Sequence, residues 1–306
     1  SKKMKTPYSD QVRLLVNLLP IVEKQTCFAL KGGTAINLFI RDMPRLSVDI
    51  DLAYLPVEGR DQSLEGINTA LGNIIEDIQK RIPRAQVKAV KLKGTDKRCK
   101  LLVQQGATHV KIEVTPVLRG SVYPSQTCRI SENAEKTFGF ASMTLLSFED
   151  LFGGKICATL DRQHPRDLYD TYWLLQNEGI TQSLKNAFMV YLMGHNRPMA
   201  ELLAPKFQDI SPLYRAEFEG MAYEPVDLER LKDTLPNLVI QIHKALNDAD
   251  RLFLLDLKKG NADWEKFALP EAQILPAIQW KVLNLERMAP DKRRKAAHKL
   301  EKVLFG

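Results

Sequence analysis

Gly32-Gly33-Thr34, followed beyond residues 35–48 by Asp49-Ile50-Asp51, is the stretch that decides how this chain folds. Residues 48–52 alternate apolar and acidic side chains, and this period of two predicts a strand with both aspartates on one face. Strand geometry places the two Cα atoms about 6–7 Å apart. That separation suits carboxylates that hold two hard divalent cations.

The glycine pair lies where a short apolar strand, residues 27–30, is expected to meet a short helix over about 34–41. Glycines at such a turn let backbone N–H groups approach a phosphate closely, and the Thr34 hydroxyl adds a further polar group. The alternatives are an ordinary turn for the glycines and a solvated acidic face for the aspartates.

A third acid, Glu113, lies in the alternating segment 110–114. If this segment pairs beside residues 48–52, three carboxylates converge. The alternative is that Glu113 faces solvent beside Lys111. A phosphate-binding turn and three acids in this order indicate nucleotidyl transfer by two metal ions.

The rest of the pattern divides the chain near residues 142–147. The first half has a helical pattern over about 62–82. Three strand-like runs follow it, at 86–91, 100–104 and 109–118. The second half has helical patterns, at 164–176, 181–193, 227–257 and 271–304. The sequence therefore predicts an α+β chain. Its N-terminal domain, residues 1–145, combines a mixed sheet with helices, and an all-α C-terminal domain covers 146–306.

The formal charge of +7 is unevenly distributed along the 306 residues. Residues 80–100 contain nine Lys or Arg and one acid, residues 281–306 contain eight and three, and the remainder is net acidic. Two basic segments on an acidic body favour a polyanionic partner such as nucleic acid. The alternative is a solvated face and a basic tail.

Several classes of protein are not expected. The longest apolar runs, such as Leu252–Leu255, are far shorter than the ~20 residues that span a bilayer, and Ser1–Lys5 leads into no apolar signal core. We therefore expect neither a membrane span nor a secretory leader. Four scattered cysteines fit neither a zinc site nor a disulfide framework, and they favour a reducing cytosol.

Four motifs in order resemble the AbiEii/AbiGii-type nucleotidyltransferases, which are toxins of type IV toxin–antitoxin and abortive-infection systems and include the MenT toxins. The glycine turn and Arg45-Leu46-Ser47-Val48-Asp49-Ile50-Asp51 are the first. The helix Asp150–Ala158 is similar to the family pattern D-L-x-x-x-K-x-x-A, and 166–170 matches R-D-x-x-D. The tail 269–285 is similar to the family's helical end.

The resemblance implies roles for the residues of the first half. Asp49 and Asp51 would hold Mg²⁺, and Glu113 would be a third ligand or a general base. The phosphate groups of an NTP would be bound by Gly32, Gly33, Thr34, Arg45 and Ser47. For Arg45 the alternative is an ordinary surface ion pair, and Ser47 could instead orient a carboxylate.

In the second half the resemblance implies that Lys155 and Asp167 belong to the catalytic site. Lys155 lies in an apolar helix and needs an anionic partner. A triphosphate oxygen is the functional candidate, and Asp167 or Asp150 is the structural one. Asp167 is favoured over Asp170 as the active-site acid. His164 could simply cap a helix, and Gly153-Gly154 either permits close packing or marks a kink.

Together these features predict a magnesium-dependent toxin that transfers NMP from an NTP to an acceptor hydroxyl in the bacterial cytoplasm. The resemblance implies that the acceptor is RNA, at the 3′ end of tRNA, so that translation is blocked. A cognate antitoxin would be encoded nearby and act without a stable complex. Two alternatives remain open: a protein or small-molecule acceptor, and a non-enzymatic module that binds NTP or RNA.

Overall fold

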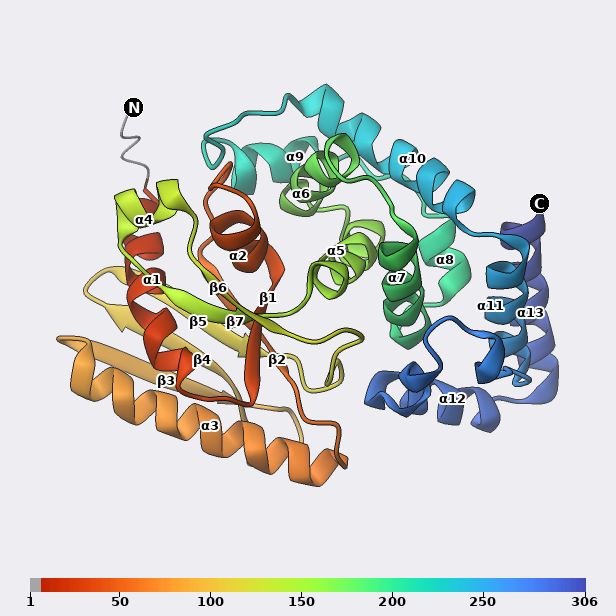
Figure 1. The fold of residues 1–306 in the computed structure, drawn as a ribbon, viewed down its shortest axis with the longest axis horizontal. Coiled ribbons are helices and arrows are strands. Elements are labelled where there is room, and N and C mark those ends of the chain that lie inside the picture. Colours follow the sequence, from red (N-terminus) through yellow and green to blue (C-terminus); the bar gives the residue numbers. More distant parts are fainter. Residues whose placement is uncertain (1–6) are drawn as a thin grey trace. The chain divides into compact units, whose positions relative to one another are not determined.

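The computed structural model describes residues 7–306, and the chain forms two units (Figure 1). The first unit contains the residues through Ser147 together with Phe218–Pro225, and the second contains Phe148–Glu217 and Val226–Gly306. The basic start Ser1–Lys5 lies outside the described residues. Within residues 7–306, no helix is long and apolar enough to cross a membrane.

The first unit is built on a mixed sheet of seven strands within the described residues, in the order β3-β4-β5-β2-β1-β7-β6. The strands are β1 Phe28–Lys31, β2 Asp49–Tyr54, β3 Ala85–Lys91, β4 Arg98–Gln105, β5 Thr108–Val114, β6 Gln126–Arg129 and β7 Ser142–Leu145. Two pairs, β1 with β7 and β2 with β5, are parallel, and the other neighbours are antiparallel. The segment that contains Glu113 pairs beside residues 48–52, which was the condition for the acids to come together.

One face of this sheet is apolar and is covered by two helices, α1 Ser9–Glu23 and α3 Arg60–Arg81. The side chains of Leu30, Leu52 and Ile112 lie on this face and are fully buried. Because side chains alternate along a strand, Lys31, Asp51 and Glu113 lie on the opposite face. The alternation that buries the core therefore also collects the charged groups on one surface.

The other elements of this unit differ from expectation in detail. The glycine-turn helix begins at Gly32 rather than at Thr34, and α2 Gly32–Ala35 continues as a π-helical turn, Ile36–Ile40. The strand expected over 109–118 ends at Val114, before Pro116. The helix α4 Glu132–Phe138 and the short strands β6 and β7 were not predicted.

The second unit is helical, as predicted for this part of the chain. Its helices are α5 Phe148–Arg162, α6 Pro165–Gln176, α7 Gln182–Gly194, α8 Met199–Leu203, α9 Ser211–Leu213, α10 Leu228–Ala245, α11 Asp248–Lys259, α12 Pro276–Arg287 and α13 Pro290–Phe305. A π-helical turn, Tyr214–Phe218, follows α9, and short 3₁₀ turns lie at Trp264–Lys266 and Pro270–Ile274. The helical stretch expected over 227–257 was expected to break at Pro236, but Pro236 lies inside α10, and the stretch is divided by a capping box at Asn247.

The glycine pair of α5 permits close packing. A Cβ atom on Gly153 would lie 3.1 Å from Tyr191 Cδ2 and 3.2 Å from the backbone nitrogen of Phe188, both on α7. At Gly154 the corresponding nearest contact is an ordinary 3.9 Å. Gly153 thus lies at the close approach of α7, where a Cβ atom would be crowded, and Gly154 does not.

The segment Phe218–Pro225 returns from the helical half of the sequence to the first unit. It pairs with residues 44–46: Leu46 N donates to Met221 O at 2.8 Å, and Tyr223 N donates to Pro44 O at 2.8 Å. The predicted division into two continuous domains did not include this crossing. It fixes the loop that leads into β2.

Candidate active site

At each glycine of the pair, a different side chain occupies the space that a Cβ atom would fill. Gly32 has a left-handed φ of 78°, and a Cβ atom there would lie 2.8 Å from Asp51 Oδ2. A Cβ atom on Gly33 would lie 2.5 Å from the Arg45 guanidinium. The turn therefore brings a carboxylate and a guanidinium against bare backbone, where a phosphate could also approach.

A row of four charged side chains crosses four strands beside this turn. In register, Lys31 on β1 lies next to Asp51 on β2, Asp51 next to Glu113 on β5, and Glu113 next to Lys100 on β4. The ammonium of Lys100 pairs with Glu113 at 3.5 Å, and Lys31 Nζ donates to Thr115 Oγ1 at 3.3 Å. Two neighbouring carboxylates are thus flanked by a lysine on each side.

The electrostatics of this row follow from burial. Burial raises the pKa of Asp51, and Asp49 and Glu113 raise it further, while Lys31 and Lys111 act in the opposite direction. Burial likewise lowers the pKa of Lys31, against the charges of Asp51 and Glu113. Negative charge on Asp51 is therefore only partly compensated by the protein, which is the environment that a bound cation would relieve.

Sequence reasoning missed Lys31. It directly precedes the glycine pair, and its register opposite Asp51 follows from the antiparallel pairing of β1 with β2. The available signal was the position of a lysine at the end of an apolar strand, immediately before a turn expected to bind phosphate.

Asp49, Asp51 and Glu113 are the carboxylates that could supply oxygen ligands to a divalent cation. Asp49 and Asp51 share a face of β2, and Asp49 lies in register with Lys111, one row away from Glu113. Within residues 7–306, no three acidic, histidine or cysteine side chains are close enough together to form a metal site by themselves. Magnesium is commonly held by one or two carboxylates together with substrate phosphates and water, so the aspartate pair fits such a cation.

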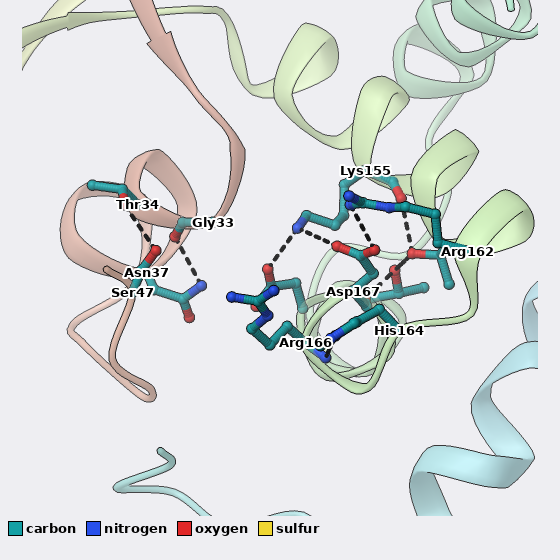
Figure 2. Close-up of polar contacts among 12 residues, drawn as sticks. Gly33, Thr34, Asn37, Ser47, Lys155, Arg162, His164, Arg166 and Asp167 are labelled. Atoms are coloured by element: carbon teal, nitrogen blue, oxygen red, sulfur yellow. Dashed lines mark hydrogen bonds and ion pairs between the residues drawn. The ribbon is translucent and has the colours of Figure 1, made fainter. Parts of the chain in front are cut away.

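Thr34 and Ser47 form a small buried network beside the glycine turn (Figure 2). Their hydroxyl oxygens are 2.8 Å apart, and Thr34 Oγ1 donates to the backbone carbonyl of Asp49. The amide of Asn37 donates to Gly33 O at 3.0 Å. The Thr34 hydroxyl is thus used within the protein, where it ties the glycine-turn helix to the start of β2.

Arg45 is buried, with only 2% of its surface exposed, so its interpretation as an ordinary surface ion pair is wrong. Its Nη1 donates to Leu46 O at 2.9 Å, and its backbone lies opposite Ala222 of the crossing segment. The crossing segment therefore holds in place the residue whose guanidinium lies against Gly33.

The second unit contains a separate buried charge cluster between α5 and α6 (Figure 2). Lys155 Nζ lies 2.9 Å from Asp167 Oδ1 and 3.0 Å from Asp170 Oδ2, and the Lys155 and Asp170 side chains are 7% and 0% exposed. Asp167 also receives Arg162 Nη2 at 2.8 Å. Asp150, the other structural partner considered for Lys155, accepts a hydrogen bond from Tyr191.

Two opposing influences set the charge of Asp167. Burial alone would raise its pKa, but the charges of Lys155 and Arg162 and the lysine hydrogen bond outweigh burial and hold the pKa below its ordinary value. His164 caps α6, because its Nδ1 accepts from Arg166 N at 3.1 Å, and its Nε2 pairs with Glu217. The capping role considered for His164 is confirmed.

The basic segment 80–100 includes the strand β3 and the start of β4. Three of its nine cations have partners within the protein: Lys97 pairs with Glu65, Lys100 pairs with Glu113, and Arg98 donates to Asn68 of α3. In the segment 281–306, by contrast, most cations lie on one helix, α13.

Comparisons with known proteins place these features in a family. A family model described as "Nucleotidyl transferase AbiEii toxin, Type IV TA system" matches residues 13–284. The chain belongs to this family, and it is a nucleotidyltransferase of the toxin type.

Among solved structures, the chain is similar to MenT4, a nucleotidyltransferase toxin from Mycobacterium tuberculosis H37Rv. The TM-score is 0.56 at 15% sequence identity, and the alignment covers 90% of this chain and 93% of that one. This likeness supports the shared fold. No significant match is found among curated proteins.

Proposed function

We propose that the protein is a magnesium-dependent toxin that transfers NMP from an NTP to the 3′-terminal hydroxyl of tRNA and thereby blocks translation. The observation that carries this proposal is the approach of Asp51 to the backbone of Gly32, beside Glu113 in register. Carboxylates and accessible backbone next to one another suit a nucleotide bound through its phosphates and a cation.

The residues of the first unit would divide the work between binding and orientation. Gly32 and Gly33 leave backbone open to the phosphates, and the buried guanidinium of Arg45 supplies positive charge beside them. Thr34 and Ser47 orient the start of β2 through their hydroxyl network. Lys31 and Lys100 hold the carboxylate row in place from either side.

Asp49 and Asp51 would hold the magnesium ions, and Glu113 would complete the set as a ligand or accept the proton of the acceptor hydroxyl. When bound, two such ions activate the attacking oxygen and stabilise the charge on the leaving pyrophosphate. Lys155 and Asp167 of the second unit would also have a catalytic role, with Asp167 holding the Lys155 ammonium in place. An antitoxin encoded nearby would counteract the toxin without a stable complex.

The test is incubation of the pure protein with each α-labelled NTP, Mg²⁺ and deacylated total tRNA. We expect label at the tRNA 3′ end, loss of label with chelator, and loss in Asp51→Asn. The matched control is Glu65→Gln, which removes an acid on α3 whose side chain is 60% exposed. Labelled tRNA with Asp51→Asn would refute the assigned chemistry. Label in a protein band or a small-molecule fraction instead of RNA would show that the acceptor is a protein or a small molecule rather than tRNA.

A further inference from the structure

A cavity of about 300 Å³ lies between α11 and α13, which pack side by side in the second unit (Figure 1). Its polar lining consists of Lys259, Arg293, Arg294, His298 and Glu301. The lining residues of α13 recur at intervals of three and four, so they form one face of that helix. Small or compact residues, Ala297 and Pro290, complete the lining and leave the space open.

The charge of this cavity is positive. Arg293, Arg294 and Lys259 face one lining carboxylate, Glu301, while Arg294 also contacts Asp291 on the same helix. Arg293 is anchored, because its Nη1 donates to Leu285 O at 3.4 Å. Within residues 7–306, the side chains of Lys259 and His298 have no hydrogen bond or ion pair, so their donors remain available for an anion.

Outside the cavity, α13 continues as a cationic surface. Its other exposed cations recur along the helix, at Lys292, Lys295, Lys299 and Lys302. A rise of 1.5 Å per residue spreads this stripe over about 15 Å. A single free phosphate needs no such extended array, whereas a polymer with a phosphate at each unit does.

We propose that the cavity between α11 and α13, together with the outer stripe of α13, binds the phosphate backbone of RNA. The guanidinium groups suit phosphate oxygens, and the cavity lining contains no phenylalanine, tyrosine or tryptophan, which disfavours a site for a stacked base. The site positions RNA without reading its sequence. The proposal rests on the proposed function, since it takes RNA as the acceptor.

The test measures binding apart from catalysis. A fluorescein-labelled RNA hairpin with a single-stranded 3′ end is titrated, without NTP, at several salt concentrations. The cavity variant is Lys259→Gln/Arg294→Gln. The matched control, Lys80→Gln/Arg81→Gln, removes two exposed charges at the end of α3. We expect the cavity variant to weaken binding roughly tenfold and to reduce the slope of log K against log salt by about 1.4–1.8, while the control changes neither.

A gain-of-function variant guards against damage to the fold. Glu301→Gln removes the acid of the cavity lining and should tighten RNA binding several-fold. Equal salt slopes for cavity variant and control, or no RNA binding by the unchanged protein, would overturn the proposal. So would binding of inorganic phosphate that RNA does not displace. If RNA is bound with the expected slopes but no label is transferred, the proposed acceptor fails and this site stands.

Discussion

Replacing Lys155 by methionine should destabilise the second unit strongly. The ammonium lies 2.9 Å from Asp167 and 3.0 Å from Asp170, and both carboxylates are nearly inaccessible to water. Methionine fills a similar volume, but it takes the ammonium partner away from two buried carboxylates. Breaking a buried pair from one side costs about 3–5 kcal/mol, which is a large fraction of ordinary domain stability. For a unit of this size, the midpoint temperature of thermal unfolding should fall by roughly 6–20 °C.

The pH dependence gives this prediction its sharper form. In the unchanged protein the pKa of Asp167 is held below its ordinary value, so its pairing stabilises the fold above that value and is lost as pH falls through the native pKa. Without Lys155, the pKa of Asp167 should rise, because burial is then opposed by Arg162 but no longer by the lysine. Asp167 should then become neutral at a higher pH than in the unchanged protein. The difference in unfolding free energy between the two proteins should therefore be large at pH 7.5 and smaller at pH 5.

The free energy of unfolding is measured at each pH by urea titration, with tryptophan fluorescence as the probe. Trp173, Trp264 and Trp280 are the three tryptophans of the chain, and all lie in the second unit. The matched control is Arg162→Met, which removes the other cation bound to Asp167. That arginine is 63% exposed, so its loss should cost about 1 kcal/mol or less. A cost below 1 kcal/mol for Lys155→Met, or one independent of pH, would refute the reasoning.

Three further predictions concern backbone geometry. Gly33→Ala should displace the Arg45 guanidinium and abolish NTP binding measured by calorimetry, whereas Gly59→Ala, which has open space, should bind normally. Tyr223→Pro removes the N–H that bonds to Pro44 O and should weaken NTP binding at least tenfold. The control is Tyr223→Ala, which keeps this N–H. Unchanged NTP binding by Tyr223→Pro would show that the crossing segment is dispensable. Gly153→Ala should destabilise the second unit by about 1–3 kcal/mol, but Gly154→Ala should stabilise it by up to about 1 kcal/mol; equal melting temperatures would contradict the packing at α7.

The local features of the fold were predictable because they depend on neighbouring residues. The alternation at 48–52 identified β2 and the common face of Asp49 and Asp51, and the similar alternation at 110–114 identified β5. Their pairing was left open by the sequence, and the structure shows it. Helix existence in the second half followed from apolar spacing, while the boundaries depended on caps such as Asn247.

What sequence reasoning missed depends on contacts between distant segments. The short strands β6 and β7 are stabilised by their place in the sheet rather than by a long local pattern. Nothing near Arg45 indicated that residues 218–225 would pair with its loop and bury it. Lys31 was overlooked for the same reason, since its partners Asp51 and Glu113 come from two other strands.

The glycine pair shows how these two kinds of information combine. A turn that exposes N–H groups to phosphate explains why small residues are favoured there, but it does not explain why both positions should be glycine. The structure supplies a separate reason for each: Asp51 lies against Gly32, and Arg45 lies against Gly33. A side chain at either position would displace a charged group as well as obstruct the backbone. The motif therefore specifies where a carboxylate and a guanidinium lie relative to the same turn, which is the arrangement that a nucleotide with its cation requires.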